Sequence, residues 1–296
     1  MSAVRPVVQA QERFDRGRFT FQFGPRDRGL AESLSEFAVA SDTFPGLPRP
    51  AQRVIIAIAP DARRFRDLTG GAAPEWGSAV AFPDSRRIVM QGQRAGSDAG
   101  DPRAVLRHEL AHLALHEFLG NLPPRWFDEG YASYAAGEWG RQEVLATNLA
   151  IAFDGLPTLD ALDEQFTGGE TAAQSAYALA FSAVVDLASR DPERGLPLFF
   201  GYWRASKTMD MAMRRAYGMT LADFEAEWRR RTRQRYGALA LVSNIALAGL
   251  LLLFVLAPFW LSRRRRDRAR LQKMREADAA AEAAEKSAID DLLGGA

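Results

Sequence analysis

Residues 101–136 read DPRAVLRHELAHLALHEFLGNLPPRWFDEGYASYAA, and this stretch decides how the rest of the chain is interpreted. Asp101 followed by Pro102 is typical of a helix start, because a carboxylate caps free backbone amides and proline is favoured at the first helical position. Gly120 favours a helix end, ahead of two prolines. The stretch therefore predicts a helix over 102–119 and a second helix over 124–140.

The first predicted helix contains the motif HELAH, in which His108 and His112 are four residues apart. Residues at this spacing share one helix face, about 6 Å apart along the axis. Both imidazoles can therefore reach one metal ion at about 2.0–2.1 Å. Glu109 lies on the neighbouring stripe, where it can face a metal-bound water. The alternative interpretation is a surface helix whose two histidines bind no metal.

His116 continues the histidine spacing but does not fit the same ion. It lies about 12 Å along the helix axis from His108 and about 80° around it. No glycine between His112 and His116 allows the chain to turn. We therefore expect His116 to be structural or exposed.

A third metal ligand must come from elsewhere, because the chain has no other histidine and no cysteine. A turn broken by proline, followed by a second helix packed on the first, would carry Glu129 back beside the two histidines. Gly130 would remove a side chain where these two helices approach each other.

The motif HExxH followed by WFDEGYA over 126–132 resembles the gluzincin clan of zinc metallopeptidases, and within it the small bacterial peptidase MA-like domain. Residues 74–81, 177–181 and 216–228 resemble further parts of that domain, so the resemblance covers roughly residues 12–235. It implies a Zn²⁺ ion held by His108, His112 and Glu129, with a water in the fourth position. It also implies that Glu109 acts as the general base in peptide-bond hydrolysis.

The resemblance leaves the oxyanion donor open. Related peptidases use a tyrosine or histidine from the helical lobe, so Tyr177 is our candidate, and a core tyrosine is the alternative interpretation. We expect Tyr131 and Tyr134 to be packing residues and Trp126 to pack beneath the site.

The chain also departs from the family pattern. Ser133 stands where thermolysin has the aspartate that orients a histidine, and Asp128 stands where the clan's aminopeptidases have asparagine. A glutamate motif for a free α-amino group is not evident in residues 77–81. An endopeptidase that binds an extended peptide along residues 79–83 fits better.

The order of the predicted elements gives the fold class. Runs rich in β-branched and aromatic residues predict short strands, and helical patterns dominate after residue 101. Strands followed by helices predict an α+β domain with two lobes. The resemblance makes this a zincin-like domain, with a small N-terminal sheet and active-site helix and a C-terminal helical lobe. The predicted strands are 19–23, 53–59, 79–83 and 87–92, and the further predicted helices are 30–44, 171–190, 193–205, 207–217 and 220–235.

Residues 238–261 read ALALVSNIALAGLLLLFVLAPFWL, in which only a serine and an asparagine are polar. About 24 residues at 1.5 Å each span about 36 Å, enough to cross a hydrocarbon core of about 30 Å. We expect one C-terminal transmembrane helix over 237–262 that binds the lipid bilayer; a buried core helix is the alternative. Five arginines precede the run and eight basic residues follow it. The positive-inside rule therefore places the tail, 263–296, in the cytoplasm and the catalytic domain outside.

That orientation requires an export signal, and residues 1–11, MSAVRPVVQAQ, lack an apolar segment of that kind. Residues 8–10 resemble the end of a cleavage site, so we interpret 1–11 as the remnant of a signal peptide. A cytosol-facing domain with a C-terminal anchor is the alternative. The tail is basic in its first half and acidic in its second. We expect the basic half to contact anionic headgroups, and the acidic half to be either a solvated segment or one that binds a cytoplasmic partner.

The amino-acid composition excludes several classes of function for this chain. The 296 residues carry 38 basic and 37 acidic side chains, a net charge of +1, which argues against a nucleic-acid partner. The absence of cysteine excludes a thiolate zinc site and a cysteine nucleophile. We therefore expect a peptide or protein substrate for the domain over 12–236. The alternative is a non-catalytic, zinc-stabilised binding or scaffold domain, against which the intact Glu109 argues.

Overall fold

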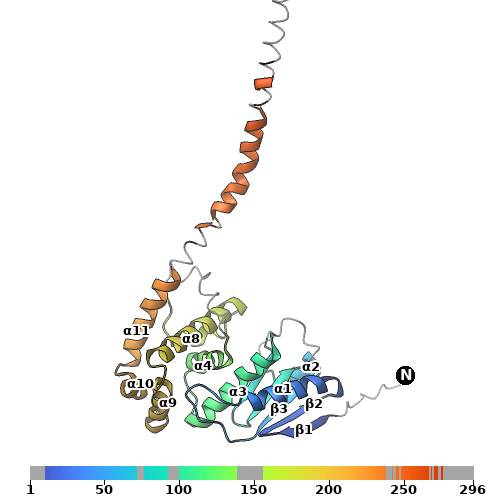
Figure 1. The fold of residues 1–296 in the computed structure, drawn as a ribbon, viewed down its shortest axis with the longest axis vertical. Helices are drawn as coiled ribbons and strands as arrows, with labels where there is room; N and C mark the ends of the chain where they lie inside the picture. The colour runs from blue at the N-terminus through green and yellow to red at the C-terminus, as the bar shows by residue number, and fades with distance from the viewer. Residues whose placement is uncertain are drawn as a thin grey trace, which may run out of the picture. The chain divides into compact units, whose positions relative to one another are not determined.

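The computed structural model describes residues 11–71, 77–92, 100–138 and 156–237, and beyond them 242, 245, 246, 248–266, 268, 270–272 and 275. The chain divides into two compact units, Met1–Ala240 and Leu241–Ala296. The first unit contains the sheet and the helices labelled in Figure 1. The residues interpreted as a signal-peptide remnant, apart from Gln11, and the acidic end of the tail lie outside the described residues.

The second unit contains helical residues over 248–266, whose side chains are exposed. Among the described residues of the chain, no helix is both long and apolar enough to cross a membrane. The predicted span over 237–262 includes residues 238–241, 243, 244 and 247, which lie outside the described residues.

Five strands form one mixed sheet in the order β1-β2-β3-β5-β4. The central pairs β2–β3 and β3–β5 are parallel, and the outer pairs β1–β2 and β4–β5 are antiparallel. All four predicted strands are present, with ends that differ by one residue at most. The bounds are β1 Glu12–Arg16, β2 Phe19–Phe23, β3 Val54–Ala59, β4 Ala79–Phe82 and β5 Arg87–Gln91.

Strand β1 was not predicted, because its sequence ERFDR is mostly charged. Its one aromatic side chain explains why it joins the sheet. Phe14 stacks on Phe21 with ring centroids 5.5 Å apart and meets Phe23 edge-on at 5.4 Å. An edge strand needs only one buried face, so a single aromatic residue is sufficient here.

The two faces of the sheet bury different residues. Phe21 and Ile56 belong to the main core, which the sheet shares with α1 (Arg28–Ala40) and α3 (Pro102–Leu119). On the opposite face, α2 (Ala62–Thr69) places Phe65 against Ala57 and Val89. Helix α2 was not predicted, because four of its eight residues are charged and few are apolar.

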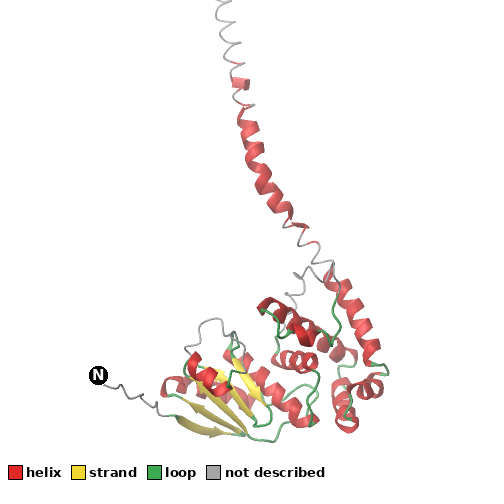
Figure 2. Ribbon diagram, turned by 180° about the vertical axis from the view of Figure 1, so that it is seen from behind, coloured by secondary structure: helices red, strands yellow, loops and turns green. Residues whose placement is uncertain are grey.

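The C-terminal half of the first unit is helical, as predicted, and Figure 2 shows it beside the part that contains the strands. Helix α3 has the predicted bounds, whereas α4 ends before residue 140 because Gly137 adopts a left-handed conformation with φ of 75°. The first unit is therefore α+β with two parts. Among the described residues, the helices of the second part are α4 Arg125–Ala136, α7 Leu162–Gln165, α8 Glu170–Arg190, α9 Gly195–Ser206, α10 Met209–Tyr217 and α11 Leu221–Thr232, and a π-helical turn, η3 Arg233–Gly237, follows them.

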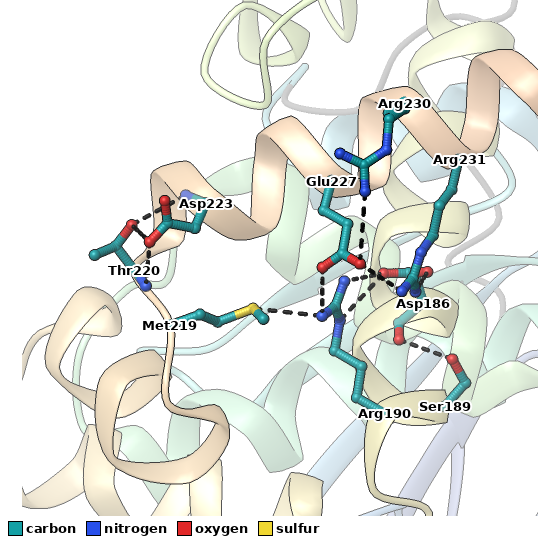
Figure 3. A network of polar contacts seen from close by, with 9 residues as sticks. All are labelled: Asp186, Ser189, Arg190, Met219, Thr220, Asp223, Glu227, Arg230 and Arg231. Carbon is teal, nitrogen blue, oxygen red and sulfur yellow. Dashed lines mark hydrogen bonds and ion pairs between the residues drawn. The ribbon is translucent and has the colours of Figure 1, made fainter.

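Helix α11 is joined to α8 by a network of ion pairs (Figure 3). The guanidinium of Arg190 donates to Asp186 at 2.9 Å and to Glu227 at 2.9 Å, and Arg231 pairs with Asp186 at 3.2 Å. Arg190 also lies over the ring of Phe224, 5.1 Å from its centroid. Because Arg190 is largely buried, this network fixes how the last helix of the unit packs.

Helix α4 packs between α3 and α8, and Gly130 decides one of these contacts. We expected Gly130 to allow α4 to approach α3, and that expectation is wrong. A Cβ atom at this position would lie 2.5 Å from the carbonyl oxygen of Ala180 and 3.0 Å from the Val184 side chain, both on α8. The missing side chain therefore serves the packing of α4 on α8.

Candidate metal centre

Helix α3 carries the two histidines of the motif, and their rings lie side by side. Its first turn is capped by Asp101, whose side chain accepts a hydrogen bond from the backbone N–H of Arg103 at 3.0 Å. The imidazole rings of His108 and His112 are 4.9 Å apart between centroids, and both residues are buried. The i, i+4 spacing therefore places both rings on the same buried face of the helix.

Helix α4 places a carboxylate beside these two rings. The Oε2 atom of Glu129 lies 3.5 Å from Nε2 of His108 and 3.6 Å from Nε2 of His112. One potential ligand atom from each of the three residues lies within 4.8 Å of the others. Three ligands at about 2.1 Å from a tetrahedral ion are about 3.4 Å apart, so the two measured distances fit such an ion.

Two further carboxylates contact the Nδ1 atoms of the imidazole rings, the nitrogens that do not face Glu129. Nδ1 of His112 lies 2.8 Å from Oδ1 of Asp128, and Nδ1 of His108 lies 3.2 Å from Oε1 of Glu138. A histidine that donates its Nδ1 proton to a carboxylate leaves the Nε2 lone pair for a metal. Both rings therefore have the orientation that a metal ligand needs once Nε2 has lost its proton, and the donor set of two nitrogens and one oxygen suits Zn²⁺.

His116 lies outside this group of three. Its Nε2 atom lies 2.9 Å from Oδ2 of Asp128, the second oxygen of the carboxylate that holds His112. Burial alone would raise the pKa of Asp128, but the charge of His112 and hydrogen bonds with both histidines outweigh it and hold the pKa well below its usual range. Asp128 therefore remains ionised, and His116 helps to orient it.

Glu109 is buried beside the three ligand residues without belonging to them. Burial raises the pKa of its carboxyl group, while the nearby His112 and His108 and a backbone hydrogen bond from Ala81 lower it, and the net shift is upward. Ala81 belongs to β4, at the edge of the sheet. A carboxylate with a raised pKa is suited to accept and then return a proton.

The three ligand residues and Glu109 line one cleft with a volume of about 780 Å³. Residues 79–81 of β4 form part of its wall, as does Tyr177 of α8. The ring of Tyr177 meets Phe166 edge-on with centroids 5.0 Å apart. Trp126 is fully buried in the core, as expected, and so is Tyr131, whose hydroxyl donates to the Pro45 carbonyl at 2.9 Å.

Sequence reasoning missed Asp128 and Glu138 as the partners of the histidines. The thermolysin-like position, Ser133, is buried and does not fill that role. Asp128 directly precedes Glu129 in α4, and this position beside a metal ligand is the signal in the sequence that could have identified it. Glu138 follows the end of α4, and only the fold shows that this segment passes His108.

We expect metal binding to release protons at neutral pH. Burial lowers the pKa of both histidines, but hydrogen bonds with Glu129 and Glu138 raise that of His108 to about 9, and the charge and hydrogen bond of Asp128 raise that of His112 to about 10. Below these values protons compete with the metal, so zinc affinity should increase as pH rises toward 9 and decrease as pH falls.

Titration calorimetry at pH 7 in buffers of different ionisation enthalpy measures this release. The expected value approaches about two protons per metal ion. The matched variant Asp128→Asn should release fewer, because the charge that raises the pKa of His112 is gone. A heat of binding that is the same in every buffer would contradict the expectation.

Comparison with known protein families gives one match that covers more than half of the chain. The profile of the Peptidase MA superfamily matches residues 49–234. No curated protein matches the chain. Among solved structures, the chain is similar to an M1 zinc metallopeptidase from Deinococcus radiodurans, with 15% sequence identity and a TM-score of 0.41. The match covers 75% of this chain and 48% of that one, so the chain spans about half the length of that structure.

Proposed function

The chain belongs to the Peptidase MA superfamily, and on this premise we propose that it is a zinc-dependent metallopeptidase. The observation that carries the proposal is the convergence of Glu129 with His108 and His112, with Glu109 buried beside them as a carboxylate outside the ligand group. A purely structural zinc site is closed by four protein ligands and has no use for such a group.

The proposed roles follow from the positions of the side chains. His108, His112 and Glu129 would hold Zn²⁺, which when bound polarises a carbonyl and lowers the pKa of a water toward 7. Glu109 accepts a proton from the attacking water and passes it to the leaving amine. Asp128 and Glu138 keep the two imidazoles oriented.

Two finer features of the reaction belong to the proposal. The edge strand β4 lines the cleft, and an edge strand has free backbone groups that can bind an extended peptide, which favours an endopeptidase. Tyr177 lines the same cleft from α8, so its hydroxyl is our candidate to stabilise the oxyanion.

Membrane attachment and location are proposals from the sequence alone. The apolar composition of residues 238–261 and the basic residues after it support a C-terminal anchor, with the peptidase domain outside the cytoplasm and the tail inside. The split charge of the tail supports contact with headgroups and with a cytoplasmic partner.

Removal and return of the metal test the proposed function. The full chain should cleave an unstructured protein substrate, lose this activity in a chelator, and regain it with one equivalent of Zn²⁺. Fragment masses from the digest would distinguish an endopeptidase from an exopeptidase. Zinc bound at one equivalent with no cleavage of any unstructured substrate would favour a zinc-stabilised binding domain instead.

A further inference from the structure

One wall of the cleft carries a stack of three side chains. The guanidinium of Arg125, at the start of α4, lies over the ring of Phe166, 5.0 Å from its centroid. Phe166 in turn meets Tyr177 edge-on. All three residues line the cleft that contains the metal-ligand group. A guanidinium held over an aromatic ring keeps the N–H groups at its edge able to bind a ligand.

The charge of Arg125 is poorly compensated within the protein. It is the only arginine or lysine among the described residues that line the cleft. Its contact with Glu129 is long, 4.0 Å from Nε to Oε1, and its side chain is 41% exposed. Among the described residues, no acceptor lies within hydrogen-bond distance of the Arg125 guanidinium.

The acidic groups nearby have other partners. Asp163, which also interacts electrostatically with Arg125, accepts hydrogen bonds from the backbone N–H of Trp126 at 3.1 Å and from that of Arg125. Glu129 directs its Oε2 atom to the two histidines of the ligand group. Asp128 shares its two oxygens between His112 and His116. A metal ion bound by Glu129 would further weaken the ion pair between Glu129 and Arg125, because the metal would neutralise the carboxylate charge. Arg125 is then a cation on the wall of a substrate cleft, and no carboxylate among the described residues accepts a hydrogen bond from its guanidinium.

We infer that Arg125 binds a carboxylate group of the substrate, and that the cleft therefore selects peptides with a negative charge near the bond to be cleaved. The inference rests on the proposed peptidase function. A planar guanidinium matches a carboxylate through two parallel N–H···O bonds. In an unmodified peptide at neutral pH, the negative groups are aspartate or glutamate side chains and the C-terminal carboxylate. These sources share one chemistry and differ in their position along the peptide.

Peptide binding to an inactive, zinc-loaded protein tests the inference and identifies the source. The full chain with Glu109→Gln is titrated with four peptides of equal length that share a central phenylalanine. One is acetylated, amidated and neutral. The others carry glutamate before the phenylalanine, glutamate after it, or a free carboxylate at the C-terminus. We expect at least one charged peptide to bind about tenfold more tightly than the neutral one.

Adding Arg125→Gln to the same background should reduce that tenfold preference to a ratio near one, because the amide cannot compensate a negative charge. A matched control is Arg204→Gln. The Arg204 guanidinium also lies 5.0 Å from an aromatic centroid, that of Phe118, but Arg204 does not line the cleft. This control should retain the preference. Zinc content is measured in every variant, so that a loss of preference cannot come from a loss of metal.

Three results would overturn the inference: no charged peptide binds more tightly than the neutral one, the preference survives Arg125→Gln, or Arg204→Gln removes it as well. Failure of the proposed function gives a different result. A protein with Glu109 intact that cleaves none of the peptides, while the Arg125-dependent preference persists in the titrations, would refute the hydrolase and retain the carboxylate site.

Discussion

Replacing Glu109 by glutamine should lower kcat/KM for peptide hydrolysis by about 10²–10⁴-fold. Glutamine has nearly the same size, so the buried position beside His108 and His112 can still be filled, but an amide cannot accept the proton of the attacking water. Zinc content should remain near one per chain, because Glu109 lies outside the ligand group. The measurement is the rate of cleavage of a fluorogenic peptide, with zinc determined on the same samples.

Glu117→Gln provides the matched control on the same helix. The Glu117 carboxylate accepts a hydrogen bond from the backbone N–H of Ala51 at 3.0 Å and lies away from the cleft. An amide oxygen can accept the same bond, so cleavage should remain within about twofold of the original rate. If Glu109→Gln and Glu117→Gln cleave equally well, the hydrolysis does not come from this site.

Replacing Gly130 by alanine should destabilise the first unit by about 3 kcal/mol or more. The new methyl group would lie 2.5 Å from the carbonyl oxygen of Ala180, and backbone cannot move aside as a side chain can. The α4–α8 contact would have to open. Because Glu129 is the preceding residue, the displacement should also weaken zinc binding. The measurement is the urea midpoint followed by tryptophan fluorescence, together with the zinc affinity.

The control for this substitution is Gly201→Ala in α9. Gly201 is exposed inside the helix, and a Cβ atom there would meet nothing within 4 Å. Alanine is favoured over glycine in a helix by about 0.5–1 kcal/mol, so this variant should be slightly more stable than the original chain. Equal urea midpoints for the two variants would show that α4 and α8 do not approach as closely as described.

Much of the sheet and the α3 helix could be predicted from local sequence. Residues 54–59, VIIAIA, form a strand because β-branched residues suit a buried parallel pair. Helix α3 is bounded by a capping aspartate with proline at one end and a glycine at the other. Strand β1 and helix α2 were not predicted, because at least half of the residues of each are charged and each has a single aromatic residue, Phe14 or Phe65.

The metal-ligand group was predictable for a similar reason. The separation of His108 and His112 is set by the helix itself, so the sequence alone determines that they can share an ion. The position of Glu129 depended on a second helix folding back, which the resemblance to gluzincins implied and the fold displays. Of the two carboxylates that hold the histidines, Asp128 could be found from its position directly before Glu129. Glu138 could not be predicted, since a side chain that orients a ligand needs only proximity in space.

By itself, the sequence determined the local features: the segments that form strands, the ends of α3 and the spacing of the two histidines on one helix. These depend on local geometry, which a short segment carries within itself. Only the tertiary structure decided which carboxylates hold His108 and His112, which helix Gly130 faces, and that Arg125 lies on the wall of the cleft. Those facts depend on how separate elements pack against each other, and no local pattern fixes that packing.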